Sequence, residues 1–168
     1  IINKNGIKSV KPFPQKKTRP CIFEYIYFSR PDSILENKSV YEHRKNLGKE
    51  LGKESSIESD LIVPVPDSGV PAAIGYAEHM KKSVEFGIIR NHYVGRTFIE
   101  PSKKIRSFGV KLKLSPNKTL IKNKSIILID DSIVRGTTSI KIVKMMYEAG
   151  AKEVHLRIAC PQIKFPDY

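Results

Sequence analysis

Apolar residues in this chain gather in short runs, several of them rich in β-branched side chains. The runs at 61–65 and 125–129 have the composition of strands that are buried on both faces of a parallel sheet. Residues 84–89 and 153–158 predict two further strands. The aromatic and β-branched stretch 21–28 predicts a fifth strand, which a turn follows.

Helical spacing of apolar residues separates these runs. Residues 39–54 predict a polar helix, with Ser39 and Glu42 in capping-box spacing and an apolar stripe so narrow that we expect a surface position. Residues 70–81 predict a helix with a proline in its first turn, and 140–149 an amphipathic helix. This alternation predicts an α/β fold, a parallel sheet with helices on both faces and right-handed crossovers.

Residues 1–20 are basic, contain three prolines and lack the apolar content of a folded unit. We expect them to form a linker or an extended arm, followed by one domain over 21–168. The chain begins with Ile rather than Met and stops soon after the last predicted strand. We therefore expect a piece of a longer polypeptide, truncated at its C-terminal end.

The composition is that of an ordinary globular protein, with 40% hydrophobic and 28% charged residues among 168. No apolar run approaches the ~20 residues of a membrane span, and no signal-peptide pattern is visible at the start of the sequence. Two distant cysteines do not make a disulfide framework, so we expect a cytoplasmic protein without a membrane partner. The net charge of +13 invites a nucleic-acid partner, but lysines dominate and are spread along the chain, which argues against one.

The stretch 125–139 combines a buried strand, two aspartates, an Arg-Gly pair and three hydroxyl residues. Gly136 lets the backbone turn tightly beside an oxyanion, while the hydroxyls of residues 137–139 can cap the helix near its positive dipole end. Asp130 and Asp131 start out on opposite faces of the strand, so one suits sugar hydroxyls and the other a loop or a metal's water shell. A plain strand-turn-helix is the alternative, and the ordered combination argues against it.

A second strand-turn-helix unit places Asp67-Ser68-Gly69 after the strand at 61–65. It presents backbone N–H groups and a hydroxyl at the carboxyl end of a strand, where open parallel sheets bind ligands. A simple tight turn is the alternative. The segment from residue 90 onward has no sustained period and carries Tyr93 and Arg96, which fits a lid that excludes water from a hydrolysable ligand.

The stretch 125–139 resembles the phosphoribosyl-pyrophosphate (PRPP) binding motif of type I phosphoribosyltransferases. The segments 20–33, 63–69 and 93–99 resemble, in the same order, segments of the glutamine PRPP amidotransferases (amidophosphoribosyltransferases). This resemblance implies a type I phosphoribosyltransferase fold and a glycosyltransferase that makes 5-phosphoribosylamine and pyrophosphate from PRPP and glutamine-derived ammonia. That reaction is the first step of de novo purine (IMP) biosynthesis. Nucleotide feedback inhibitors and a homo-oligomeric full-length enzyme are implied with it.

Transfer from PRPP needs Mg²⁺ at the departing pyrophosphate, an anchored 5-phosphate, and carboxylates near the positive charge at C1. The resemblance assigns the pyrophosphate to Asp67, Ser68 and Gly69, the 5-phosphate to Arg135, Gly136, Thr137, Thr138 and Ser139, and Mg²⁺ to Ser68, Asp130 and Asp131. We expect the catalytic residues to be Asp130, Asp131, Tyr93 and Arg96. Residues 90–107 resemble the flexible loop that orders over PRPP and helps to form an ammonia channel.

Two departures from the family matter. The N-terminal glutaminase half, with its catalytic cysteine, is absent, so we expect residues 1–20 to be the linker from that domain. Some members carry an iron-sulfur cluster whose first ligand position matches Cys21, but Asp167 stands at the second, so no cluster is expected. Cys21, inside its predicted strand, and Cys160 are then expected to be buried thiols.

Two other functions stay open at the level of sequence. One is a type I phosphoribosyltransferase with a nucleobase as acceptor. The other is a PRPP-sensing regulator that keeps the fold and binds nucleic acid. The segment 20–33 favours ammonia over a nucleobase, and the intact pyrophosphate loop and aspartate pair favour an enzyme over a regulator.

Overall fold

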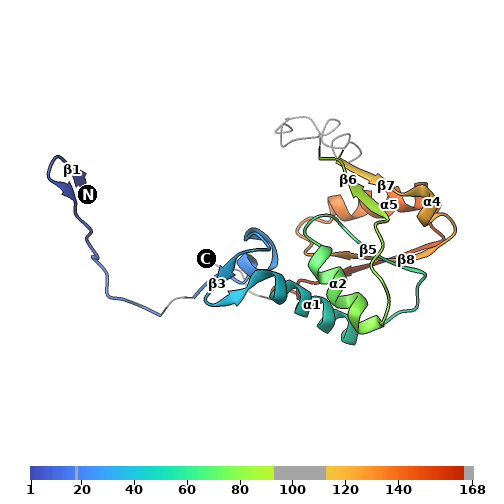
Figure 1. Ribbon diagram of the computed structural model, residues 1–168, viewed down its shortest axis with the longest axis horizontal. Helices are drawn as coiled ribbons and strands as arrows, with labels where there is room; N and C mark the ends of the chain where they lie inside the picture. The colour runs from blue at the N-terminus through green and yellow to red at the C-terminus, as the bar shows by residue number, and fades with distance from the viewer. Residues whose placement is uncertain (18, 93–112, 165–168) are drawn as a thin grey trace.

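The computed structural model describes residues 1–17, 19–92 and 113–164 (Figure 1). Its strands are β1 (Ile2–Asn3), β2 (Gly6–Ile7), β3 (Ile34–Leu35), β4 (Lys38–Ser39), β5 (Leu61–Pro64), β6 (Ile88–Arg90), β7 (Leu114–Pro116), β8 (Ser125–Asp130) and β9 (Glu153–Ile158). Its helices are η1 (Glu24–Phe28), α1 (Val40–Glu54), α2 (Val70–Met80), α4 (Lys118–Ile121) and α5 (Thr137–Glu148). Among the described residues, no helix is both long and apolar enough to cross a membrane.

A parallel sheet lies at the centre of the domain, with the strand order β5-β8-β9. β8 is the middle strand, and Leu128 pairs with Val63 on one side and with Leu156 on the other. Val84 adds a parallel bridge to Ile62 at the outer edge of β5. The predicted strands at 61–65, 125–129 and 153–158 and the α/β class are confirmed.

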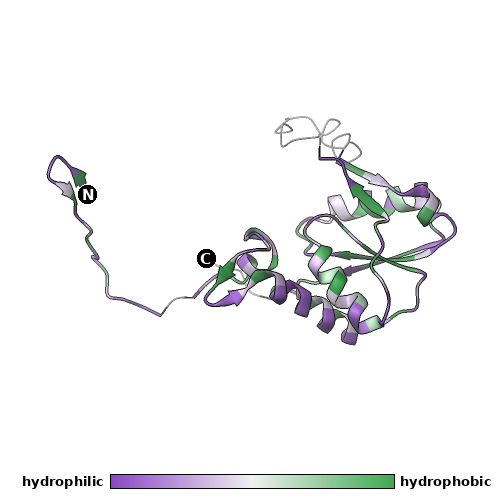
Figure 2. Ribbon diagram, in the orientation of Figure 1, coloured by the Kyte–Doolittle hydropathy of each residue, from purple (hydrophilic) through white to green (hydrophobic). Residues whose placement is uncertain are grey.

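Helices cover both faces of this sheet, as predicted. Because side chains alternate along a strand, Ile126 and Leu128 of β8 pack into the cluster that contains residues of α5. Ile127 and Ile129 pack into the cluster that contains residues of α2. Figure 2 shows the hydrophobic colour along parts of the central strands and the hydrophilic one over much of α1.

Helix α1 follows its predicted bounds, and Ser39 caps it by accepting a hydrogen bond from the N–H of Glu42 at 3.3 Å. It packs on α2 rather than on the sheet (Figure 1). Glycines set the contact, because a Cβ atom at Gly48 would lie 1.9 Å from the carbonyl oxygen of Ala72, and one at Gly75 1.8 Å from that of Lys45. The narrow apolar stripe predicted the peripheral position of α1, but not its close approach to α2.

The strand predicted at 21–28 is wrong. Those residues form a turn and the single π-helical turn η1, and their hydrogen bonds are local, as in Ser29 N–H to the Glu24 carbonyl at 3.2 Å. The aromatic rings that indicated a strand contact one another instead, with the ring centroids of Phe23 and Phe28 5.8 Å apart. Buried Arg44 of α1 binds the carbonyl oxygens of Tyr25 and Ser29, which a sheet partner would otherwise have taken.

The strand predicted at 84–89 is shorter and lies further along the chain, as β6 at Ile88–Arg90. Only Val84 bridges β5, while β6 turns away and pairs antiparallel with β7. Gly87 explains the bend, because a Cβ atom there would lie 2.8 Å from the Val63 side chain. The sequence did not predict β7 or the short α4, although both bury residues in the core, Leu114 and Ile121.

The N-terminal arm extends away from the domain (Figure 1). Its first residues form a small antiparallel hairpin, β1 with β2, whose residues are exposed. Its extended form fits the predicted linker. The assignment of 1–20 to a link with a glutaminase domain remains a prediction.

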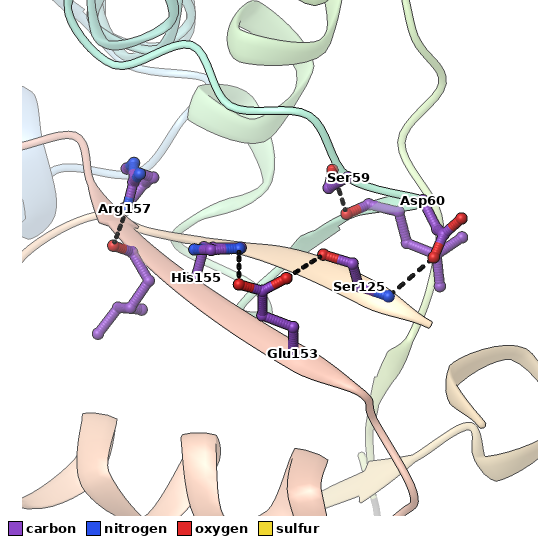
Figure 3. A network of polar contacts seen from close by, with 8 residues as sticks. Ser59, Asp60, Ser125, Glu153, His155 and Arg157 are labelled. Carbon is purple, nitrogen blue, oxygen red and sulfur yellow. Dashed lines mark hydrogen bonds and ion pairs between the residues drawn. The ribbon is translucent and has the colours of Figure 1, made fainter. Parts of the chain in front are cut away.

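A polar network joins the amino ends of the central strands (Figure 3). The Asp60 carboxylate accepts the N–H of Ser125 at 2.8 Å, and the Ser125 hydroxyl donates to Glu153 at 3.3 Å. Glu153 also lies 3.1 Å from Nε2 of His155. Since ligands bind at the opposite edge of a parallel sheet, this network holds strands together and leaves the carboxyl edge for function.

Gly75→Ala should destabilise the domain. The new methyl group would meet the main chain of α1, and the expected loss of about 1–3 kcal/mol or more in unfolding free energy exceeds the gain of about 1 kcal/mol in helix propensity. Urea denaturation measures the change. Gly52→Ala is the matched control and should lose less stability, because its methyl group would meet side-chain atoms of exposed His79 at 2.9–3.1 Å rather than the main chain. Equal stability of Gly75→Ala and wild type would contradict the proposed contact.

Candidate active site

The turn after β5 lies directly against the end of β8. Its Gly69 N–H donates to the carbonyl of Val65 at 3.0 Å, which closes the turn, and Pro71 occupies the first turn of α2. A Cβ atom at Gly69 would lie 2.4 Å from the carbonyl oxygen of Ile129. Glycine is therefore needed for the approach of the two main chains, and the predicted tight turn is confirmed.

Asp130 ends β8 and Asp131 follows it, and both are buried, with 7% and 6% of their surface exposed. Asp131 accepts a hydrogen bond from the Ser68 hydroxyl at 2.9 Å and another from Ser132 at 3.0 Å. Asp130 accepts the N–H of Asp131 at 3.0 Å. The structure thus brings together Ser68, Asp130 and Asp131, the three residues that the sequence nominated for a metal.

Burial changes the acid–base behaviour of Asp130. Burial, followed by the hydrogen bond and charge of Asp131, raises the pKa of Asp130 to about 7. A buried carboxyl that keeps its proton near neutral pH beside a second carboxylate is a place where a divalent cation can replace the proton. The donors are hard oxygens, which Mg²⁺ prefers, and Mg²⁺ takes only one or two carboxylates beside waters and phosphate oxygens. The residues present therefore fit this metal.

Histidines and cysteines do not contribute to such a site. In the described part of the chain, no three His, Cys, Asp or Glu residues are grouped to hold a metal ion by themselves. The prediction that Cys21 is a buried thiol in a strand is wrong, because it lies exposed ahead of η1, where no sheet covers it. Cys160 is half-buried, and burial raises the pKa of its thiol.

The amino end of α5 forms the other half of the candidate site. Gly136 precedes the helix with φ 71°, a left-handed conformation that suits glycine. Ile140 is the first residue whose N–H bonds back, to the Gly136 carbonyl at 3.0 Å, so the N–H groups of residues 137–139 have no acceptor within the helix. The prediction that the three hydroxyls cap α5 is wrong, since these residues form its first turn. Arg135, Thr137 and Thr138 are exposed and Ser139 is buried.

Two arginines that sequence reasoning missed belong to the surroundings of this edge. Arg90, at the end of β6, makes an ion pair with Asp67 of the turn. Arg44, in the amino-terminal half of α1, is buried, which lowers the pKa of its guanidinium, while the charge of Asp131 raises it. Nothing in the local sequence indicated either role, because Arg44 lies in a helix that is largely polar and Arg90 at the end of a strand. Tyr93, Arg96 and the rest of the expected lid up to residue 107 lie outside the described residues.

A hollow of about 550 Å³ lies beside α5 and is nearly all apolar. Ile133, Ile140 and Tyr147 are among the residues that line it. It touches Gly136 and Ser139, but a polyanion needs N–H groups or charges, so the chemistry of this hollow does not suit a phosphate.

Residues 31–163 match the family model described as a phosphoribosyl transferase domain. The chain is 58% identical over 163 residues to the amidophosphoribosyltransferase of Rhizobium etli, which covers 97% of this chain and 33% of that protein. It is 51% identical over 166 residues to the enzyme of the same name from Bacillus subtilis, covering 99% of this chain and 35% of that one. The chain thus spans about a third of the length of the curated relatives it matches.

Solved structures agree with this. The chain superposes with a TM-score of 0.82 and 50% identity on the glutamine PRPP amidotransferase of B. subtilis complexed with ADP and GMP. The match covers 99% of this chain and 36% of that one. The type I phosphoribosyltransferase fold expected from the sequence is confirmed.

Asp130→Asn should flatten the pH dependence of stability. A carboxyl pKa raised from 3.8 to about 7 makes the folded state bind its proton more tightly than the unfolded state. The stabilisation from that proton is complete below about pH 4 and is lost as the pH rises to about 7, at up to about 1.4 kcal/mol per pH unit. Asparagine keeps an oxygen for the Asp131 N–H but has no such proton.

Urea denaturation in EDTA at pH 5 and pH 8 measures this effect. The unfolding free energy of Asp130→Asn, relative to wild type, should be higher at pH 8 than at pH 5. Asp60→Asn, at the amino end of the sheet, is the matched control. The same difference from wild type at both values would show that Asp130 titrates normally.

Proposed function

This chain belongs to the phosphoribosyl transferase domain family, and we propose that it is the phosphoribosyltransferase part of an amidophosphoribosyltransferase. In this proposal it transfers ammonia to C1 of PRPP and releases pyrophosphate, the first step of purine synthesis. The names of its relatives, at 58% and 51% identity, support the choice of acceptor. Glutamine would supply the ammonia through a part of the enzyme that the matched third does not contain.

One observation carries the proposal, the 2.9 Å hydrogen bond from the Ser68 hydroxyl to the Asp131 carboxylate. It joins the turn after β5 to the aspartate pair after β8 across 63 residues of sequence. A ligand with a pyrophosphate and a ribose needs both features at one edge of the sheet. Neither a simple tight turn nor a plain strand-turn-helix requires the two loops to meet.

We propose that Asp130, Asp131 and Ser68 hold Mg²⁺, directly or through its waters. When bound, Mg²⁺ neutralises charge on the departing pyrophosphate. The carboxylates of the same pair also face the positive charge that develops at C1 as the bond to pyrophosphate breaks. Because Gly69 lets the turn approach β8, the two carboxylates lie near the loop proposed to hold the pyrophosphate.

The 5-phosphate is proposed to bind at the amino end of α5. The unpaired N–H groups of residues 137–139 and the helix dipole favour an anion there, and Gly136 leaves the approach open because no Cβ is present. Arg135 and the hydroxyls of Thr137, Thr138 and Ser139 add donors. Tyr93 and Arg96 keep their proposed place in a lid over the ligand.

Further properties of the whole enzyme are proposals of the same kind. The B. subtilis relative was solved with ADP and GMP, and another solved neighbour is titled an allosteric regulatory enzyme of purine biosynthesis, which supports inhibition by purine nucleotides. We also propose a homo-oligomer for the full-length enzyme. Two unpaired cysteines support a cytoplasmic location, although the names of the plant relatives place those proteins in chloroplasts.

The 168-residue chain should release pyrophosphate from PRPP with ammonium and Mg²⁺, and should not do so with glutamine when ammonia is excluded. The physical reason is that the described site contains no group that could hydrolyse glutamine. Enzyme-coupled detection of pyrophosphate measures the rate. Faster release with adenine, guanine or hypoxanthine than with ammonium would contradict the choice of acceptor and favour a nucleobase phosphoribosyltransferase.

Asp131→Asn should lower turnover of Mg-PRPP more than tenfold, because it removes a charge aimed at the metal or the sugar. Steady-state kinetics with saturating ammonium measures the loss. Asp60→Asn makes the same chemical change at the far end of the sheet and should keep nearly full activity. Kinetics close to wild type for Asp131→Asn would show that this carboxylate does not have the proposed role.

A further inference from the structure

Arg44 is a buried cation without a carboxylate in contact. Only 4% of its surface is exposed. Its Nε atom donates to the carbonyl oxygen of Tyr25 and its Nη2 atom to that of Ser29, both at 2.8 Å. Both acceptors are neutral, and no ion pair joins Arg44 to another described residue within 4 Å. Burial of a charge is costly unless another charge offsets it, so the position of this guanidinium requires an explanation.

The packing of α1 on α2 places Arg44 beside the candidate site. Gly48 lies against Ala72 and Gly52 against His79, so along this face the two helices run in the same direction and the amino end of α2 meets the middle of α1, while Lys45 contacts Gly75. Arg44 lies one turn before Gly48 on α1, and we infer from the Gly48–Ala72 contact that this places it on the side of the residues that precede Ala72. Those residues include Ser68, which holds Asp131.

Electrostatics agrees with this placement. Burial lowers the pKa of Arg44, and the charge of Asp131 raises it. The carboxylate that offsets the buried guanidinium is therefore Asp131, although the two side chains form no ion pair in contact. Arg44 belongs to the charge balance of the site while its hydrogen bonds attach the segment 25–29 to α1.

We propose that Arg44 is a positioning residue whose fixed positive charge offsets Asp131, so that the site takes a divalent cation together with a polyanion rather than ahead of it. A bare cation is disfavoured because the negative charge of Asp131 is already partly balanced. A cation that arrives with a diphosphate brings its own negative charge, which the guanidinium favours. This inference rests on the proposed function only for the identity of that anion.

Arg44→Gln and Arg44→Met remove the charge, and Arg44→Lys keeps it. For both neutral variants, Mn²⁺ alone should bind at least about tenfold more tightly, because a nearby unit charge at an effective dielectric constant of about 20 changes the affinity for a divalent ion by at least that factor. Inorganic pyrophosphate without metal should bind about tenfold more weakly to the same variants. Arg44→Lys should keep both affinities within about twofold of wild type while losing stability with one of its hydrogen bonds.

The measurements are electron paramagnetic resonance of free Mn²⁺, calorimetry with pyrophosphate, and the urea midpoint of each variant. Arg30→Gln is the matched control, because Arg30 is exposed and pairs with Asp32. Opposite shifts for cation and anion support the proposal, since a purely structural role would weaken both. Weaker or unchanged Mn²⁺ binding in a folded neutral variant would overturn it. Two neutral substitutions are included because methionine can fill a buried position if glutamine prevents folding.

These readouts separate the inference from the proposed function. Both binding experiments use no PRPP and no acceptor. Suppose that wild type fails to release pyrophosphate from PRPP, but that the neutral variants bind Mn²⁺ more tightly and pyrophosphate more weakly. The proposed function is then contradicted and the proposed role of Arg44 is supported. If wild type is active and the affinities for Mn²⁺ and pyrophosphate do not change in the neutral variants, only the proposed role of Arg44 is contradicted.

Discussion

Two carboxylates buried side by side at the end of an apolar strand are the constraint that the rest of the structure meets. Leaving Asp130 and Asp131 unpaired out of water would cost several kcal/mol. Hydroxyl donors from Ser68 and Ser132 reduce this cost for Asp131, and a retained proton reduces it for Asp130. The remaining charge is offset from a distance by Arg44. Turn, strand end and helix α1 are therefore linked through one small group of atoms.

The main chain fixes this group in place. The carbonyl oxygens of Asp130 and Asp131 accept the N–H groups of Ala159 and Cys160, at 2.9 and 2.8 Å, so pairing with the β9 strand continues past its end. On the other side, the N–H of Val65 donates to Ile129 at 2.9 Å. Two flanking chain segments thus hold the end of β8 through backbone hydrogen bonds, which do not depend on side-chain rotamers. A site built in this way is organised before its ligand arrives, as electrostatic catalysis requires.

Local patterns predicted the parts of the fold whose signals are local. A few neighbouring residues suffice to predict the strands β5, β8 and β9 and the cap of α1 at Ser39. The same is true of Ser68 and the aspartate pair as candidate site residues. The strand prediction for 21–28 is wrong because an aromatic composition is typical of a strand and does not reveal the π-helical turn. The hydrogen bonds from Arg44, which is distant in sequence, to carbonyl groups in and after this segment are also not visible in the local pattern. The glycine contacts between α1 and α2, and the pair of Arg90 with Asp67, join residues more than twenty positions apart. No periodicity within either partner encodes such a pairing, so the surroundings of the site were less predictable than its centre.

The two ends of the candidate site attract an anion by different means. At the start of α5, unpaired N–H groups and the helix dipole act on a phosphate without any ionisable carboxyl group, so this end should change little with pH or metal. At the aspartate pair, an anion meets negative charge unless a proton or a divalent cation intervenes. The chain's net charge of +13 can draw a polyanion from solution, but salt screens such attraction beyond about 8–10 Å. The long-range field therefore cannot replace a cation at the aspartates, and in the proposed function the phosphate end holds the ligand while the pyrophosphate end decides whether it reacts.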